Sequence, residues 1–213
     1  MGGLPTREEV YEALKERHGA ERQEKFSNAR VAICGLGGLG SNIAISLVRA
    51  GVGFLHLIDF DCVDISNINR QQYFLSQLGQ PKTGALKENL LRISPYVEIK
   101  TDQVKVTPDN VKALLSDADV ICEAFDVAEQ KAMLVNEVLL HFPEKYLVGG
   151  SGMAGFSSAN DIKTRRVAGR FYLCGDQVSD VADGIGLVAS RVQVCAAHQA
   201  HMVLRILTGE TEC

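Results

Sequence analysis

The chain has 213 residues, of which 46% are hydrophobic and 23% charged, a composition typical of a globular protein with one substantial core. Its formal net charge is −4, so we expect no electrostatic capture of nucleic acid or of an anionic membrane. No apolar run approaches the roughly 18 residues of a membrane span, and the scattered cysteines include no CxxC pair. These features predict a cytoplasmic protein without a structural zinc site.

The first element that the sequence predicts is an N-terminal helix. Thr6 and Glu9 have the spacing of a capping box, in which each of the two side chains satisfies a free backbone amide at the start of a helix. The polar segment at residues 17–23 follows, and we expect it to be a solvated arm. We therefore divide the chain into an N-terminal helical arm at residues 1–28 and a single domain at residues 29–213.

A glycine-rich turn between a strand and a helix organises the rest of the chain. Residues 31–34 are predicted to form a buried strand, because they are apolar without polar alternation. A helix is predicted at residues 41–50, and a second strand at residues 54–58 ends at Asp59. The turn between the first strand and the helix contains Gly35, Gly37, Gly38 and Gly40. This order is typical of nucleotide binding, because glycines let backbone amides approach a phosphate and the acid accepts a ribose hydroxyl; a tight turn without a ligand is the alternative.

A polar segment follows the second strand. Its charged and amide side chains are Asp61, Asn67, Arg70, Gln71 and Lys82. Burying unpaired charges in a core costs several kcal/mol, so these side chains are expected on a surface or in a site. Because open α/β sheets bind ligands beyond the carboxyl ends of their strands, we favour a site.

The remaining residues continue the alternation of strands and helices. Further strands are predicted at residues 97–100, 119–123 and 146–148, with helices at residues 108–115 and 128–140. Antiparallel strands are predicted within residues 156–173, with the basic residues 163–166 on an exposed face, and a last helix at residues 186–207. The sequence therefore predicts an α/β fold with a doubly wound, mostly parallel sheet, antiparallel C-terminal strands and a C-terminal helix.

Asp126 follows a predicted strand and is expected at the same edge of the sheet as the glycine turn. A carboxylate beside a bound triphosphate can hold Mg²⁺, while the alternative role is capping the helix that follows. A nicotinamide-dependent dehydrogenase would use the same turn and acid, but it does not account for Arg70 and Lys82, and none of the 5 histidines stands in a predicted catalytic loop. A non-catalytic nucleotide-binding scaffold is the other alternative.

These motifs, taken in order, resemble a known family. The motifs are GLGGLG at residues 35–40, DFD at 59–61, SNINRQ at 66–71, GQPK at 79–82 and Asp126, and they are similar to those of the ThiF/MoeB adenylyltransferases, relatives of the ubiquitin-activating enzymes. The resemblance is strongest over residues 22–131, and the length and FYLCGD at residues 171–176 are most similar to short ThiF-type proteins of thiamine biosynthesis. It implies a Rossmann-like fold.

The resemblance also implies an activity, cofactors and a partner. The activity is ATP- and Mg²⁺-dependent adenylylation of the C-terminal glycine carboxylate of a small ubiquitin-like sulfur carrier ending in Gly-Gly, with release of pyrophosphate. The pathway is thiamine or related sulfur-cofactor biosynthesis, and the sequence does not name the carrier. Such a reaction needs no general base, because a carboxylate is already ionised at pH 7.

The resemblance assigns roles to individual residues of this chain. Asp126 would hold Mg²⁺, and Asp59, with Asp61 beside it, would bind the ribose. The phosphates would be surrounded by Gly35, Gly37, Gly38 and Gly40 and held by Asn67, Arg70, Gln71 and Lys82.

Two further expectations come from the resemblance. Relatives take an arginine from the N-terminal arm of the partner subunit, which implies a homodimer in which Arg17 or Arg22 completes the partner's site. Cys174 is the candidate for covalent uptake of the activated carrier or its sulfur, since it lies in glycine-rich surroundings. Glu123 and Val127 depart from the family pattern, in which aspartate and asparagine are usual at these positions.

Overall fold

A mostly parallel sheet forms the centre of the structure. The computed structural model describes residues 3–213, and in them seven strands form one sheet in the order β3-β2-β1-β4-β5-β7-β6. Every neighbouring pair is parallel except β6 with β7, so the predicted α/β fold is confirmed. The strands are β1 (Arg30–Cys34), β2 (Phe54–Ile58), β3 (Glu98–Asp102), β4 (Val120–Glu123), β5 (Tyr146–Gly150), β6 (Lys163–Ala168) and β7 (Phe171–Gly175).

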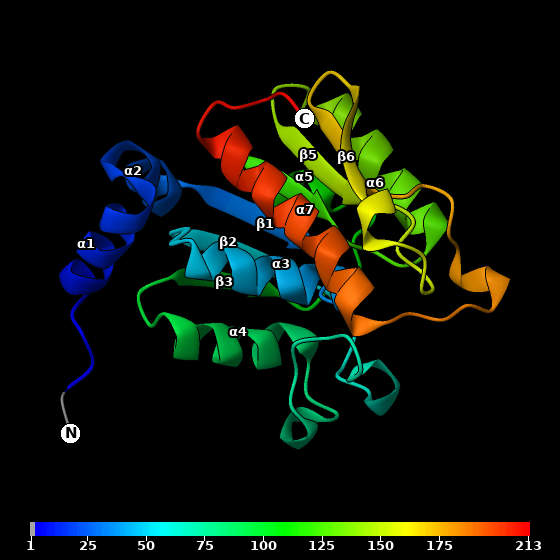
Figure 1. The fold of residues 1–213 in the computed structure, drawn as a ribbon, viewed down its shortest axis with the longest axis horizontal. Helices are drawn as coiled ribbons and strands as arrows, with labels where there is room; N and C mark the ends of the chain where they lie inside the picture. Colours follow the sequence, from blue (N-terminus) through cyan, green and yellow to red (C-terminus); the bar gives the residue numbers. More distant parts are fainter. Residues whose placement is uncertain (1–2) are drawn as a thin grey trace.

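Helices cover both faces of the sheet (Figure 1). One buried cluster contains apolar side chains of α3, α4 and α7, and a second cluster, on the other face, contains those of α5 and α6. Figure 1 shows α7 lying beside α3 on the first face. The helices are α1 (Arg7–His18), α2 (Ala20–Asn28), α3 (Gly38–Arg49), α4 (Lys82–Ile93), α5 (Val111–Leu115), α6 (Ala128–His141) and α7 (Ala189–Leu207).

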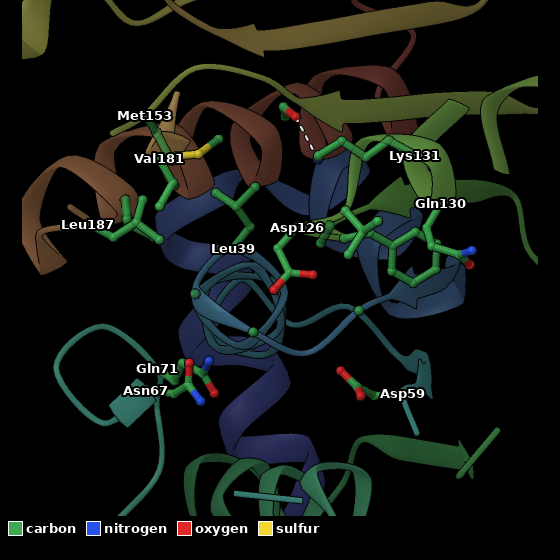
Figure 2. Close-up of a pocket in the computed structure, with 18 of the residues that line it drawn as sticks. Leu39, Asp59, Asn67, Gln71, Asp126, Gln130, Lys131, Met153, Val181 and Leu187 are labelled. Atoms are coloured by element: carbon green, nitrogen blue, oxygen red, sulfur yellow. Dashed lines mark hydrogen bonds between the residues drawn. The ribbon is translucent and has the colours of Figure 1, made fainter. Parts of the chain in front are cut away.

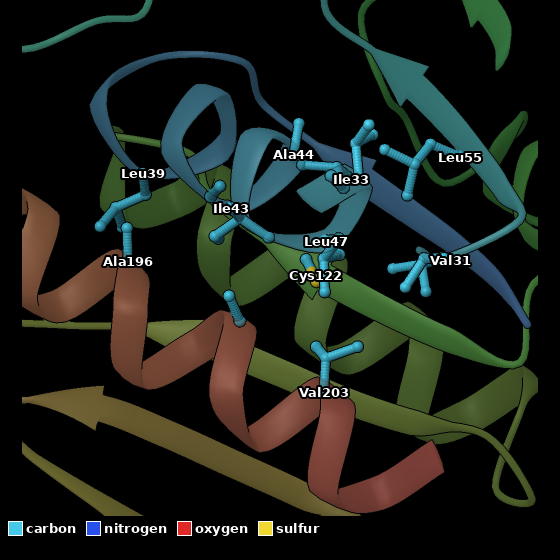
Figure 3. Close-up of a cluster of buried hydrophobic side chains, with 14 of the residues drawn as sticks. Val31, Ile33, Leu39, Ile43, Ala44, Leu47, Leu55, Cys122, Ala196 and Val203 are labelled. Carbon is cyan, nitrogen blue, oxygen red and sulfur yellow. The ribbon is translucent and has the colours of Figure 1, made fainter. Parts of the chain in front are cut away.

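Strand β1 explains the unbroken apolar run in the sequence. Val31 and Ile33 belong to the cluster under α3 and α7, while Ala32 and Cys34 belong to the cluster under α5 and α6. All four are 0% exposed, because a strand covered on both faces has no polar side to present. Figure 3 shows α3 and α7 packed over Val31 and Ile33.

The order of the strands creates a crevice at one point of the sheet edge. From β1 the chain moves to β2 and β3 on one side, and it then returns to β4 and β5 on the other side of β1. The loops after β1 and β4 therefore leave the sheet in opposite directions from neighbouring strands and open a crevice between them. Ligands of doubly wound sheets bind at this switch point.

Two helices form the described part of the segment predicted as an N-terminal helical arm. The capping box of Thr6 and Glu9 is present at the start of α1. The predicted exposure of residues 17–23 is confirmed except at His18 and Gln23. The segment is helical, because α1 continues to His18 and α2 begins directly after Gly19, whose φ of 86° ends the first helix. Gln23 is 1% exposed and contacts the ring of His18 at 2.9 Å. The contact with the body of the protein, which the sequence does not reveal, buries this side chain.

Several boundaries also shift. Helix α3 begins at Gly38 rather than at residue 41, and α7 begins at Ala189 rather than at residue 186. Within the predicted antiparallel segment, the antiparallel pairing involves only β6 and β7, while β7 is also parallel to β5. The basic residues 163–166 lie on exposed β6 as predicted, with only Thr164 partly buried. None of the helices in residues 3–213 is long and apolar enough to cross a membrane.

Candidate active site

One cavity of about 440 Å³ lies at the carboxyl edge of the sheet, at the switch point (Figure 2). Loops after β1, β2, β3, β4, β5 and β7 line it. The predicted residues that the fold brings together there are Gly35, Gly37, Gly38, Asp59, Asp61, Asn67, Arg70, Gln71, Lys82 and Asp126. Residues that are up to 91 positions apart in the sequence thus share one wall, because parallel strands end at the same edge.

The glycines of the turn have different roles. Gly35 has a φ of 92°, and a Cβ at this position would stand 2.7 Å from the carbonyl oxygen of Ala124. A Cβ on Gly40 would stand 1.8 Å from the carbonyl oxygen of Gly35. Gly40 is not among the lining residues of the cavity, so its predicted place around the phosphates has no support here; its lack of a Cβ lets α3 pack against the turn. Gly37 and Gly38 line the cavity at the start of α3, where free amides and the helix dipole favour an anion.

Asp59 is held by two backbone amides. Its Oδ2 accepts from the Leu36 amide at 2.6 Å and its Oδ1 from the Asp61 amide at 2.8 Å. Burial raises the pKa of this carboxyl, while the Asp61 amide, the Lys82 charge and the Leu36 amide act in the opposite direction. Each carboxylate oxygen keeps a lone pair for a further donor, such as a ribose hydroxyl.

Two of the cationic side chains that line the cavity, Lys82 and Arg70, are held by polar neighbours. Lys82 is 5% exposed, and its Nζ lies 2.8 Å from Oδ2 of Asp61. Arg70 donates from Nη2 to Oδ1 of Asn67 and from Nη1 to Oδ1 of Asn69, both at 2.9 Å. Asn67 therefore orients the guanidinium. Both cations were predicted to lie in a site, and both line the cavity.

Two polar side chains of the cavity have unused bonding capacity. Gln71 is 8% exposed, and its Oε1 is buried without a hydrogen-bond partner. Asp126 is exposed, and no side-chain hydrogen bond holds it within residues 3–213. In Figure 2 its carboxylate points toward the middle of the cavity, over the glycine turn. The alternative role of Asp126 as a helix cap is wrong, because Val127 occupies the cap position of α6.

The donor set determines how a magnesium ion would fit. Within residues 3–213 there is no group of three or more histidine, cysteine or acidic side chains that could hold a metal alone. Mg²⁺ usually takes one or two carboxylates together with phosphate oxygens and water. Asp126 therefore fits Mg²⁺ in company with a bound polyphosphate, and not as a site of its own.

Sequence reasoning missed the two apolar ends of the cavity. Beside Asp59, the lining includes Phe60, Phe125 and the segment 104–106 that follows β3. At the other end Figure 2 shows Leu39, Met153, Val181 and Leu187 gathered together. Neither group has a motif of its own, since ordinary apolar residues become lining residues only through the positions of their loops.

Cys174 does not have the environment predicted for it. It lies in β7 rather than in a loop and is 0% exposed. Burial raises the pKa of its thiol to about 12, although the Thr164 hydroxyl opposes this. A reactive cysteine needs an accessible setting that favours the thiolate. This buried setting does not support the covalent role predicted for Cys174.

The remaining candidates lie away from the cavity. Arg17 and Arg22 are exposed on α1 and α2, which precede β1 and so lie at the opposite edge of the sheet (Figure 1). Neither reaches the cavity of its own chain, and their role in a partner's site stays a prediction. No histidine lines the cavity among the described residues; His56, for example, contacts Asp102 at 2.6 Å in the sheet. The dehydrogenase alternative therefore lacks a histidine proton donor.

Comparison with known proteins identifies the family. The ThiF family model matches residues 11–213. The chain belongs to the ThiF family. It is 30% identical over 220 aligned positions to the sulfur carrier protein ThiS adenylyltransferase of Bacillus subtilis, covering 100% of this chain and 63% of that protein. It is also 37% identical over 123 positions to the tRNA threonylcarbamoyladenosine dehydratase of Bacillus subtilis, covering 57% and 48%. The chain thus spans less than two thirds of these ThiF-family relatives.

Solved structures support the fold. The E. coli tRNA N6-threonylcarbamoyladenosine dehydratase in complex with ATP superimposes with a TM-score of 0.85 at 21% identity, covering 94% of each chain. E. coli MccB with ATP gives a TM-score of 0.72 at 21% identity, covering 100% of this chain and 67% of that one. At 21% identity, these two structures show only that this chain has the same fold, in agreement with the doubly wound sheet described above.

Proposed function

We propose that this protein binds ATP in the cavity and adenylylates the C-terminal carboxylate of a small ubiquitin-like sulfur carrier, releasing pyrophosphate. The observation that carries the proposal is the convergence of Gly37, Arg70, Lys82 and Asp126 on one cavity beside Asp59. A ThiS adenylyltransferase among the relatives supports the choice of substrate and a role in thiamine or related sulfur-cofactor biosynthesis.

The side chains that line the cavity suggest where each part of ATP would bind. The ribose would bond to Asp59, and the adenine would lie against Phe60 and residues 104–106. The phosphates would lie over the start of α3, where the amides favour anions. Arg70 and Lys82 would balance the phosphate charge, with Lys82 using its donors beyond Asp61.

The transfer needs charge compensation more than proton transfer. An oxygen of the acceptor carboxylate forms a bond to the α-phosphorus, the bond from that phosphorus to the bridging oxygen breaks, and pyrophosphate leaves. The product is an acyl adenylate. Two anions must approach each other, so Arg70 and Lys82 stabilise the transition state, and removing one such group costs on the order of 10²–10³ in rate. When bound, Mg²⁺ would neutralise phosphate charge, with Asp126 as its protein ligand.

ATP–pyrophosphate exchange tests the proposal. Purified protein, Mg²⁺ and labelled pyrophosphate should give labelled ATP only when a carrier ending in Gly-Gly is added. Mass spectrometry of the carrier should show the added AMP, with the protein itself unmodified. Absence of exchange with carriers of the thiamine and molybdopterin type, in the presence of measurable ATP binding, would favour a non-catalytic nucleotide-binding scaffold instead.

A second substrate has a specific observation in its favour. The chain is 37% identical to a tRNA threonylcarbamoyladenosine dehydratase over 123 positions, and another protein of that name matches the whole fold with a TM-score of 0.85. The threonyl part of that nucleoside also ends in a carboxylate, so the same cavity could activate it. ATP consumption that depends on tRNA bearing this nucleoside, and not on a carrier, would select this second function.

We also propose a homodimer in which each N-terminal arm completes the partner's site. Arg22 lies 3.6 Å from Glu210 of its own chain, while no ion pair holds Arg17 within residues 3–213. Arg17 is therefore the better candidate for the arginine that enters the partner's site. Mixing inactive Arg17→Ala protein with inactive Lys82→Ala protein should restore part of the exchange activity, because a mixed dimer contains one complete site. A mixture without activity, formed under conditions where subunits exchange, would contradict the shared site.

A further inference from the structure

An ion pair lies in the wall of the cavity, where Lys131 is one of the lining residues. Glu123, at the end of β4, is 2% exposed, and its two carboxylate oxygens lie 3.0 and 3.1 Å from Nζ of Lys131 on α6. The same Nζ donates to the carbonyl oxygen of Gly150, at the end of β5, at 2.8 Å (Figure 2). All three donors of the ammonium group are thus engaged, and the pair joins two strand ends to the helix.

The pair also restrains the loop that carries Asp126. Oε1 of Glu123 accepts a hydrogen bond from the Phe125 amide at 2.7 Å, which closes a tight turn at residues 123–125. The Ala124 amide donates to the carbonyl oxygen of Cys34 at 2.9 Å, so this turn is anchored to β1 as well. Asp126 follows directly, and no hydrogen bond of its own side chain holds it among the described residues. Its position therefore depends on the backbone of this turn.

We propose that the Glu123–Lys131 pair positions Asp126 in the cavity. The proposal rests on the proposed function, because it takes Asp126 to be the protein ligand of Mg²⁺ bound with ATP. Glu123 is buried and Lys131 is half-buried, and a salt bridge with a buried carboxylate gives little net stability compared with apolar side chains of the same shape. Its geometric effect is therefore the better explanation. Lys131 lines the cavity, but its ammonium group is engaged by Glu123 and by the carbonyl oxygen of Gly150, so in this account the pair acts through the turn.

Replacing Lys131 tests the inference without any acceptor. In the Lys131→Met variant the buried carboxylate loses its partner, and the turn at Phe125 loosens. The affinity for ATP in the presence of Mg²⁺, measured by calorimetry, should fall about 10-fold, the lower end of the range for removing an outer-shell support. The affinity for ATP in EDTA should fall less, because Asp126 does not contact metal-free ATP and only the lost charge of Lys131 in the cavity wall acts on it. Hydrogen exchange at the Phe125 amide should become faster.

Control variants distinguish a loss of Asp126 positioning from a general loss of stability. Lys145 also donates to backbone carbonyl oxygens, those of Leu115 and Ser116, but lies outside the cavity, so Lys145→Met should leave both affinities unchanged. Lys131→Arg should retain the Mg²⁺-dependent affinity, since a guanidinium can bond both carboxylate oxygens. The double variant Glu123→Gln with Lys131→Met removes the buried charge but keeps an acceptor for the Phe125 amide, and it should recover the slow exchange.

Each outcome decides a different claim. Equal losses of ATP affinity with Mg²⁺ and with EDTA in Lys131→Met, or no loss in either, overturn the positioning role. The same loss in Lys145→Met also overturns it. If the unmodified protein binds no ATP at all, the proposed function fails instead, and unchanged exchange at Phe125 in Lys131→Met then overturns the inference independently.

Discussion

The buried ion pair between Asp176 and Arg191 predicts how the free energy of unfolding depends on pH. Arg191 is 4% exposed, and its guanidinium donates to Oδ2 of Asp176 at 2.5 Å and to the carbonyl oxygens of Ser157 and Ser158. Asp176 in turn accepts from the amides of Val178 and Ser179. Through these bonds Arg191 connects the loop after β7 to the loop after β5, and both loops line the cavity.

The expected magnitude follows from the pKa of Asp176. Burial raises this pKa, but the Ser179 and Val178 amides, the Ser179 hydroxyl and Arg191 together outweigh burial and lower it to about 2. The ordinary value is 3.8. Because the folded state binds the proton less tightly than the unfolded state, the ionised carboxylate contributes about 2 kcal/mol of stability at pH 7. This contribution is present above the unfolded pKa and is lost as the pH falls through the folded pKa.

Urea denaturation of the Asp176→Asn variant checks this reasoning. The free energy of unfolding should fall by at least about 2 kcal/mol at pH 7, since Arg191 is also left without its carboxylate. The difference from the unmodified protein should shrink by about half at pH 3, because the Asp176 carboxyl is then mostly protonated in the unfolded state while it stays ionised in the folded state. Asp161→Asn, which changes an exposed carboxylate, is the control. A difference that stays constant from pH 7 to pH 3 would refute the electrostatic account.

Three further predictions concern the site and the turn. Arg70→Ala and Lys82→Met should each lower the rate of ATP–pyrophosphate exchange by about 10²–10³ while leaving the circular dichroism spectrum unchanged; a near-normal rate would remove that cation from the mechanism. Gly40→Ala should destabilise the protein by about 3 kcal/mol in urea denaturation, because its Cβ would meet backbone at 1.8 Å. Gly38→Ala should cost less, because its Cβ would meet only side chains, the nearest being Val192 at 2.9 Å. Alkylation of the native protein should modify the exposed Cys62 and Cys213 and spare the four buried cysteines; peptide mass mapping that finds Cys174 alkylated would contradict its burial.

The sequence was a good guide to the strands and to most of the site. Residues 31–34 and 54–58 form strands as predicted, because an apolar run covered on both faces is a local signal that survives in any parallel sheet. The residues around Arg70, Lys82 and Asp126 converge for a related reason. Each follows a strand, and parallel strands bring the residues that follow them to the same edge.

Errors arose where a residue's environment depends on distant segments. The sequence around Gln23 is typical of an exposed polar segment, but α2 packs on the body of the protein and buries this side chain. The sequence around Cys174 is typical of a loop, but the residue lies in β7, whose pairing with β5 buries it. Gly40 matches the phosphate-binding motif, but its contact with the carbonyl oxygen of Gly35 gives it a packing role. Such contacts have no local signature.

Hydrophobic patterning and turn chemistry thus specify the order of the elements, the nucleotide-type turn and the edge at which the polar residues gather, since these properties depend on neighbours along the chain. The fold alone decides which polar groups pair. Lys82 with Asp61, Lys131 with Glu123 and Arg191 with Asp176 are separated by between 8 and 21 residues, and a buried charge takes whichever partner the packing brings within reach.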